Sequence, residues 1–508
     1  MKYSKATLIF TLIFSSFLFN GCNSEQNPTT RNLDVIILSD TSSFYYVDVK
    51  NYPVKNKKLP IGIFDSGTGG LTVMDAIVNY DGFNNQSKST NPDGILDFEK
   101  EYFIYLADQA NMPYGNYPSL NKTDVLKEHI LKDLQFLLSN KYYQSSSDKD
   151  YKSDKLPVKA IVIACNTATA YGMEDIEAFL KKAKLDIKVI GVINAGVKGA
   201  FENIAKDENC SIAVMATEGT VLSNGYVNAI NKYKLEFGYT RENQIYQQPG
   251  IGLAGAVDGV IDYIDTKANN TRKEYKGPSL TSKDAKINLS ILNRYSFDWS
   301  NNKILFSGTK EKPAEIQLNS IESYIYYNVV SLLEQIKNSK SAKPLKTIIL
   351  GCTHYPFYKN IFAQKLEELY NLKEEGNYVY RKFMHREITL IDPALNTAKE
   401  LYEYLGENNL FGNNELNKSE FYISVPNVQD KNIKLDSLGN FTYEYKYGRT
   451  AGIIQEYVKQ VPFNKSNLHP DVIDMLREKT PLIFKLITNF NQTNSKTEFI
   501  RSNNLVIL

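Results

Sequence analysis

The chain has 508 residues, of which 42% are apolar, and a formal net charge of +2. This length and this share of apolar residues predict a globular protein of two or three domains with ample core. The balanced charge gives no support for nucleic acid as a partner.

The N-terminus has the features of a secretory signal. Lys2 and Lys5 precede an apolar run over residues 6–19, which is too short for a typical membrane-spanning helix. Cys22 follows a glycine just after this run, as in a bacterial lipoprotein. We predict a lipoprotein signal peptide over residues 1–22, lipid attachment at Cys22, and export to the periplasmic side or the cell surface. An uncleaved signal anchor is the alternative.

Strands and helices alternate after a predicted tether over residues 23–58, within which residues 33–38 are the exception, a short strand-like run expected to pack on the body. The predicted strands are 59–64, 102–108, 158–164, 187–193, 212–216 and 347–350, and the predicted helices are 71–80, 122–139, 169–183, 221–233, 316–336 and 358–370. This alternation predicts an α/β fold with parallel sheets. The predicted domain boundaries are 59–191 with 391–430, then 192–390, then a C-terminal extension over 431–508, in which 472–484 reads as a helix.

Two cysteines occupy nearly the same setting far apart in the sequence. Cys165 lies in IVIACNTAT (residues 161–169) and Cys352 in IILGCTHYP (residues 348–356). Each is predicted to lie between a strand and a helix, where the helix N-terminus favours the thiolate. Cys210 begins an apolar strand and is predicted to be an ordinary buried cysteine. With Cys22 lipidated, three thiols are too few for a disulfide framework.

Several chemistries use such cysteines. A Cys–His hydrolase explains only Cys352 and His354. A metal site lacks further ligands, and a redox pair lacks a close Cys-x-x-Cys. Two thiols that act as proton donor and acceptor would invert a carbon centre, and this scheme uses both units. Asp65 and Asp108 follow strand ends and are candidate partners for Cys165. The alternative without function is two core cysteines that end strands.

Six motifs follow one another between residues 59 and 425. They are DSGTGGLTV (65–73), PYG (113–115), CNTAT (165–169), TEGTV (217–221), GCTHYP (351–356) and LID (390–392). Together they resemble the glutamate racemases of the aspartate/glutamate racemase superfamily, and several ordered motifs are a stronger signal than one glycine-rich loop. The resemblance implies two doubly wound parallel-sheet domains with the active site in the cleft between them.

The resemblance also implies the activity, an isomerase that interconverts L- and D-glutamate without a cofactor or metal. Cys165 and Cys352 would be the two bases on opposite faces of the α-carbon, assisted by Asp65 and His354 respectively. Hydroxyls and N–H groups around the substrate would stabilise the developing charge. The implied substrate-binding residues are Ser66, Tyr114, Gly115, Asn166, Thr167, Thr220 and Thr353.

The expected partners are the small-molecule substrate glutamate and, through the lipid anchor, a membrane; nucleic acid is not expected and a homodimer is left open. D-glutamate for cell-wall precursors is made in the cytoplasm, so an exported racemase would act on a different pool. An oxidising compartment would also threaten the thiol pair.

Two segments depart from the family pattern. In QPGIGLAGAVD (residues 248–258) the cysteine of a Cys-Pro loop is absent, and Asp258 is the acid nearest to the expected glutamate. Gln109 replaces a hydroxyl residue after Asp108. These departures leave two alternatives, a non-catalytic lipoprotein that binds acidic amino acids, and a racemase for aspartate or another amino acid.

Overall fold

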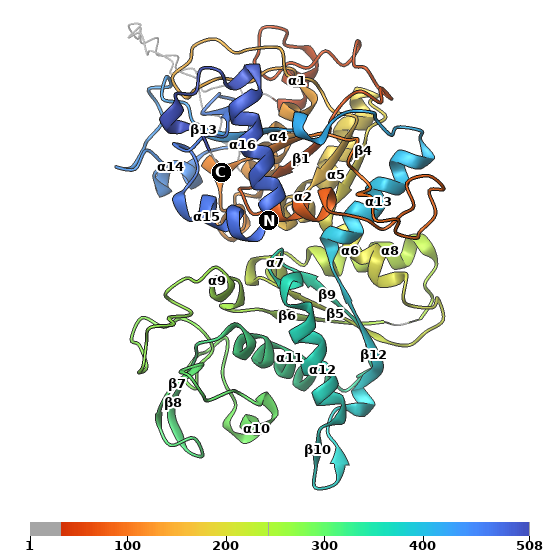
Figure 1. Ribbon diagram of the computed structural model, residues 1–508, viewed down its shortest axis with the longest axis vertical. Coiled ribbons are helices and arrows are strands. Elements are labelled where there is room, and N and C mark those ends of the chain that lie inside the picture. Colours follow the sequence, from red (N-terminus) through yellow and green to blue (C-terminus); the bar gives the residue numbers. More distant parts are fainter. Residues whose placement is uncertain (1–31, 242, 507–508) are drawn as a thin grey trace, which may run out of the picture.

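Two separate sheets organise the computed structural model, which describes residues 32–241 and 243–506 (Figure 1). The first sheet has six strands in the order β14-β13-β2-β1-β3-β4, and the second has four in the order β12-β9-β5-β6. Except for β14, which is antiparallel to β13, all neighbouring strands in these two sheets are parallel. The predicted α/β fold class is therefore confirmed. The predicted signal peptide and Cys22 lie outside the described residues.

The first sheet lies in the upper part of Figure 1 and is covered by helices on its faces. Every residue of its central strands β1 and β2 is buried, as expected for parallel strands with helices on both sides. Its strands are β1 (Ile61–Asp65), β2 (Phe103–Ala107), β3 (Ala160–Ile163), β4 (Lys188–Gly191), β13 (Glu420–Pro426) and β14 (Val458–Pro462). The helices of this part are α1 (Leu33–Ser39), α2 (Leu71–Val78), α3 (Asn116–Ser119), α4 (Thr123–Leu138), α5 (Asn166–Ala183), α13 (Pro393–Glu407), α14 (Tyr443–Gly448), α15 (Pro470–Lys479) and α16 (Pro481–Thr493).

The second sheet lies in the lower part of Figure 1. Its strands are β5 (Ser211–Ala216), β6 (Gln244–Pro249), β9 (Leu345–Gly351) and β12 (Met384–Ile391). The helices of this part are α6 (Val192–Phe201), α7 (Glu218–Leu222), α8 (Gly225–Phe237), α9 (Leu253–Val257), α10 (Leu292–Tyr295), α11 (Ile321–Lys337) and α12 (Lys359–Asn371). Two hairpins, β7 (Ile304–Gly308) with β8 (Pro313–Leu318) and β10 (Lys373–Glu374) with β11 (Asn377–Tyr378), extend from it.

The chain passes between the two sheets at two places. The first crossing runs from β4 into α6 at residues 191–192, and the second from β12 into α13 at residues 391–393. Helices α6 and α13 pack against each other at this junction, and α13 also packs on α2. The carboxyl ends of the central strands in both sheets therefore face a common region, where the polar residues that follow those strands gather.

The predicted tether is wrong for residues 39–58, and residues 33–38 pack on the body as expected but not as a strand. The run predicted to be strand-like forms helix α1, and its side chains Leu33, Ile36 and Ile37 are buried. Their i, i+3, i+4 spacing is that of one helix face, but a run of 7 residues is too short for this spacing to exclude a strand. Further along, Phe44 and other apolar side chains of this segment are also part of the core.

The predicted C-terminal extension is integrated into the first sheet. Strand β14 pairs with β13, and α16 buries Ile483, Phe484 and Phe490 in the same core as the central strands. The helix predicted over 472–484 is instead two helices, α15 and α16, separated at Pro481, because proline disfavours a helical conformation in the residue before it. No helix in the described part of the chain combines the length and the apolar character needed to cross a lipid bilayer.

Candidate active site

Cys165 follows strand β3 and is the N-cap residue of α5. Its Sγ accepts a hydrogen bond from the backbone N–H of Ala168 (3.4 Å), and the thiol lies 3.6 Å from Oγ of Ser66. Only 6% of the residue is exposed. The predicted strand–cysteine–helix unit is therefore present at this position.

Asp65 ends strand β1, which pairs with β3, and so lies near Cys165. Its Oδ2 accepts hydrogen bonds from the N–H groups of Gly67 (3.2 Å) and Gly70 (2.9 Å). Burial nevertheless raises the pKa of Asp65 above 3.8. Burial, together with the charge of Asp65, also raises the pKa of Cys165 to about 12. The N–H of Ala168 at the helix N-terminus lowers the pKa of Cys165 as expected, but the cost of burying the charge is larger.

Cys352 follows strand β9 in the second sheet and is also 6% exposed. Its Sγ lies 3.6 Å from Nδ1 of His354. Burial raises the pKa of Cys352 to about 12, and the charge of Asp258 acts in the same direction. A short 3₁₀ turn (Tyr355–Tyr358) separates this cysteine from α12, so the predicted direct junction of cysteine and α-helix is absent at this site.

Asp258 lies against the other ring nitrogen of His354. Its Oδ1 is 3.3 Å from Nε2 of the histidine, and it follows directly after α9. A proton on Nε2 would satisfy this carboxylate and leave the lone pair of Nδ1 facing the thiol of Cys352. The segment that departs from the family pattern therefore supplies an acid on the far side of His354. The sequence pattern indicates Asp258 as the nearest acid but does not predict its contact with His354.

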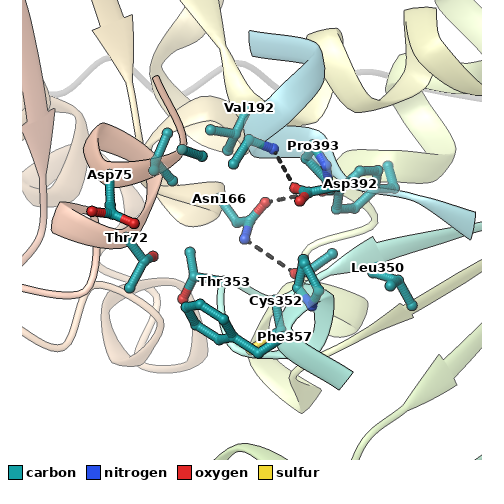
Figure 2. Close-up of a pocket in the computed structure, with 16 residues that line it drawn as sticks. Thr72, Asp75, Asn166, Val192, Leu350, Cys352, Thr353, Phe357, Asp392 and Pro393 are labelled. Atoms are coloured by element: carbon teal, nitrogen blue, oxygen red, sulfur yellow. Dashed lines mark hydrogen bonds between the residues drawn. The ribbon is translucent and has the colours of Figure 1, made fainter. Parts of the chain in front are cut away.

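One hydrogen bond links the two cysteine units (Figure 2). Nδ2 of Asn166, the residue after Cys165, donates to the carbonyl of Gly351, the residue before Cys352 (3.1 Å). Tyr226 of α8 donates to Oδ1 of Asn166 (3.2 Å). The motifs from the two sheets are thus brought together, and Cys165 and Cys352 are both free thiols. Tyr226 lies in no recognised motif and was not predicted.

A cavity of about 210 Å³ opens beside this hydrogen bond (Figure 2). It is bounded by α2, the start of α6, the turn after Cys352 and the start of α13. Burial raises the pKa of Asp75, on its α2 side, to about 6. The cavity reaches Cys352, Thr353 and Asn166 but its lining does not include Cys165. In this conformation it therefore gives access to one of the two thiols.

The other predicted substrate-binding residues differ in whether their side chains are free to contact a ligand. Thr220 is buried in α7 and its Oγ1 lies 3.0 Å from Oγ1 of Thr217. Thr167 is partly exposed in the first turn of α5, and Gly115 caps the short helix α3. Tyr114 does not present its side chain to a ligand, because the buried hydroxyl lies 2.6 Å from Asp108 and 2.7 Å from Asp133. Only the backbone of Tyr114 remains for such a role.

Asp108 was a candidate partner for Cys165, and the structure gives it different contacts. Its two carboxylate oxygens accept hydrogen bonds from Nδ2 of Asn111 (3.0 and 2.9 Å) and from Tyr114. The nearer acid to Cys165 is Asp65.

Comparison with known proteins shows similarity along much of the chain. The chain is 25% identical over 356 residues to a glutamate racemase of Oceanobacillus iheyensis, covering 70% of this chain and 82% of that protein. It is 24% identical over 357 residues to glutamate racemase 2 of Bacillus subtilis, covering 70% and 84%. A crystal structure of a glutamate racemase isoform from Bacillus anthracis matches with 21% identity and a TM-score of 0.40, covering 72% of this chain and 88% of that one. No protein-family model matches.

Proposed function

Because this chain is a relative of the glutamate racemases in the aspartate/glutamate racemase superfamily, we propose that it interconverts L- and D-glutamate by proton transfer between two cysteines. The observation that carries this proposal is the pairing of two strand-end thiols from different sheets through the Asn166–Gly351 hydrogen bond. Each thiol has its own acid–base partner, Asp65 for Cys165 and His354 for Cys352.

The reaction starts from two neutral thiols, because burial raises both pKa values to about 12. Asp65 accepts the proton of Cys165. The resulting thiolate removes the α-proton from one face of glutamate, so that a C–H bond breaks and an S–H bond forms. Cys352 delivers its proton to the opposite face, leaving a thiolate 3.6 Å from His354. The opposite direction uses the same groups in reverse order.

His354 and Asp258 complete the second half of the site. The Cys352 thiolate left after inversion needs a proton before the next turnover in the same direction. Nδ1 of His354 takes a proton from solvent and passes it to this thiolate, and Asp258 stabilises the positive charge of the ring until the proton is transferred. Asp65 releases to solvent the proton that it took from Cys165, which completes the cycle. The acid in the altered segment 248–258 thus supports a catalytic site.

The test is the appearance of D-glutamate from L-glutamate with reduced protein, compared among three single substitutions. Cys165→Ser and Cys352→Ser should each lower inversion by at least about 10²-fold, because each removes one base. Cys210→Ser is the matched control, since Cys210 is buried directly before β5 and its Sγ accepts a hydrogen bond from Nδ2 of Asn243 (3.4 Å). Inversion that survives either of the first two substitutions would contradict the two-base scheme.

The substrate is identified by measuring the inversion rates of a panel of amino acids. Glutamate is proposed because the relatives above carry that name, and the hydroxyl and N–H groups of the site suit any acidic amino acid. Faster inversion of aspartate than of glutamate would identify aspartate as the substrate and would leave the two-cysteine mechanism unchanged. Glutamate binding without turnover, unchanged in a Cys165→Ser, Cys352→Ser double variant, would identify a binding protein instead.

We also propose that the protein is exported and anchored through a lipid on Cys22. The support is the sequence pattern alone: a basic start, a short apolar run and a glycine before the cysteine. Intact mass after expression in a bacterium tests this. We expect a chain that begins at Cys22 and carries acyl groups, and an uncleaved, unmodified N-terminus would contradict it.

A further inference from the structure

The loop after β2, residues 108–122, forms one wall beside Asp65. The N–H of Asp108 donates to the carbonyl of Asp65 (2.9 Å). A Cβ atom on Gly67 would lie 2.6 Å from Sδ of Met112 and 3.0 Å from Oε1 of Gln109, so the loop and the Asp65 turn are in close contact. A shift of this loop would therefore displace the turn that holds Asp65, which lies beside Cys165.

A buried proton-sharing cluster holds the inner side of the loop. The hydroxyl of Tyr114 lies within hydrogen-bond distance of both Asp108 and Asp133, yet it has only one proton to donate. The second contact therefore needs a protonated carboxyl group. Burial raises the pKa of Asp133 well above 3.8, which identifies Asp133 as the protonated partner.

A segment from the far end of the chain holds the outer side. Nη2 of Arg449 donates to Oδ1 of Asn111 (2.8 Å) and lies 3.2 Å from the hydroxyl of Tyr117. Nζ of Lys446, in α14, donates to the carbonyl of Met112 (2.6 Å). These contacts join residues more than 300 positions apart. Met112 is the residue that lies against Gly67, and Asn111 is directly before it.

Arg449 is itself fixed from two sides. Its guanidinium lies 4.2 Å from the centre of the Tyr457 ring, whose hydroxyl accepts a hydrogen bond from Nζ of the buried Lys132 (2.9 Å). The carbonyl of Arg449 accepts a hydrogen bond from Nζ of Lys122 (3.0 Å), at the end of the loop. Arg449 therefore stacks on the buried Tyr457 ring and makes two hydrogen bonds through Nη2. We call this arrangement, which holds loop 108–122, the clamp.

We infer that Arg449 is a positioning residue of the active site, and that the C-terminal segment 443–449 sets the placement of loop 108–122 for substrate binding. This inference rests on the racemase activity proposed above. Arg449 acts through Asn111 and Tyr117 and needs no contact with the substrate. The backbone of Tyr114 and Gly115, in the middle of the clamped loop, is the part that would meet the ligand.

Steady-state kinetics in both directions test this with three variants. Arg449→Ala should raise KM for glutamate about tenfold with kcat within about threefold of the parent, because the loop must be ordered on binding. Arg449→Lys keeps the charge and one donor and should give a KM between the two. Arg477→Ala is the matched control: Arg477 is half-exposed in α15, pairs with Asp474 and is expected to leave both constants unchanged.

Amide hydrogen exchange gives a readout independent of turnover. In Arg449→Ala, residues 108–122 should exchange faster while strands β1 and β3 keep the parental protection. A parental KM, a lower kcat at unchanged KM, or parental exchange in this loop would each overturn the role of Arg449. If the parent does not racemise glutamate, the proposed function fails, and the exchange measurement alone decides whether Arg449 positions the loop.

Discussion

Burial controls the ionisation of the groups around the two cysteines. It is the largest influence on the pKa values of Cys165, Cys352, Asp65 and Asp258, and it raises all four. Each of these groups is neutral when protonated, so a low-dielectric environment favours the protonated form. Both cysteines are therefore protonated thiols at rest. Each proton transfer needs an adjacent group that can accept the thiol proton or return it.

Asp65 should set the acid limit of activity. Only its ionised form can accept the thiol proton, and its pKa is raised above 3.8, so kcat/KM should fall with falling pH while ordinary aspartates are still ionised. Asp65→Asn should lower kcat by at least about 10²-fold. Profiles from about pH 4 to about pH 8 check this. Asp262→Asn, a surface acid paired with Lys276, is the control, and a parental profile in Asp65→Asn would contradict the assignment.

Asp258 should affect the reaction chiefly through its contact with His354. Asp258→Asn removes the charge that fixes the histidine ring, and we expect kcat/KM to fall roughly 10- to 100-fold. The fall must be equal in both directions, because the equilibrium constant of a racemisation is 1. Chiral chromatography of initial rates measures it. Parental rates in this variant would remove Asp258 from the mechanism.

Residues in short motifs could be predicted, whereas residues that act through distant contacts could not. Cys165, Asp65, Cys352 and His354 lie at strand ends within recognisable motifs. Tyr226 contacts Asn166, and Arg449 contacts Asn111 and Tyr117, through tertiary packing that leaves no local signal. The motif at Tyr114 does not tell which way the side chain points, and its contacts with Asp108 and Asp133 could not be predicted from it.

Among the elements, the turn between β1 and α2 is packed too tightly to hold a side chain at Gly70. A Cβ atom on Gly70 would lie 2.5 Å from Cβ of Asp65, 2.9 Å from Cβ of Ala164 and 2.9 Å from the hydroxyl of Tyr105. Two of these atoms belong to the backbone-proximal part of short side chains and cannot rotate away. The glycine is required by close approach, and it keeps the Asp65 carboxylate under its N–H group.

Gly70→Ala should therefore destabilise the protein by about 1–3 kcal/mol, the cost of overpacking a tight site. Urea unfolding followed by circular dichroism measures the free energy of unfolding. Gly448→Ala serves as the control, since no atom lies within 4 Å of the added Cβ, and it should change stability by less than about 0.5 kcal/mol. Equal stabilities for the two variants would show that the Gly70 turn relaxes freely.

Elements with a strong local pattern were predictable, and those stabilised by distant packing were not. The apolar runs of β1 and β3 mark buried parallel strands, and the cysteine after β3 caps the predicted helix. The run at Leu33–Ser39 is too short for its spacing to separate helix from strand. Strand β14 joins the sheet only because β13 offers an edge.

At the scale of the molecule, the site lies where the two sheets meet. Each sheet contributes one thiol, and the chain crosses between the sheets only at residues 191–192 and 391–393 within the described residues. Both cysteine residues are 6% exposed, and the cavity lining includes Cys352 but not Cys165. A ligand that touches both sulfurs therefore requires a conformation in which the cavity also reaches Cys165.

The central claim, inversion by two thiols on opposite faces, is tested most directly by the isotope at the α-carbon. The measurement is the early reaction of the reduced full chain with L-glutamate in deuterated water, followed by mass and chirality. The account predicts D-glutamate that carries deuterium at the α-carbon while the remaining L-glutamate keeps its proton, because the donor thiol takes its hydrogen from solvent. Absence of D-glutamate, or D-glutamate that retains the original proton, would contradict it.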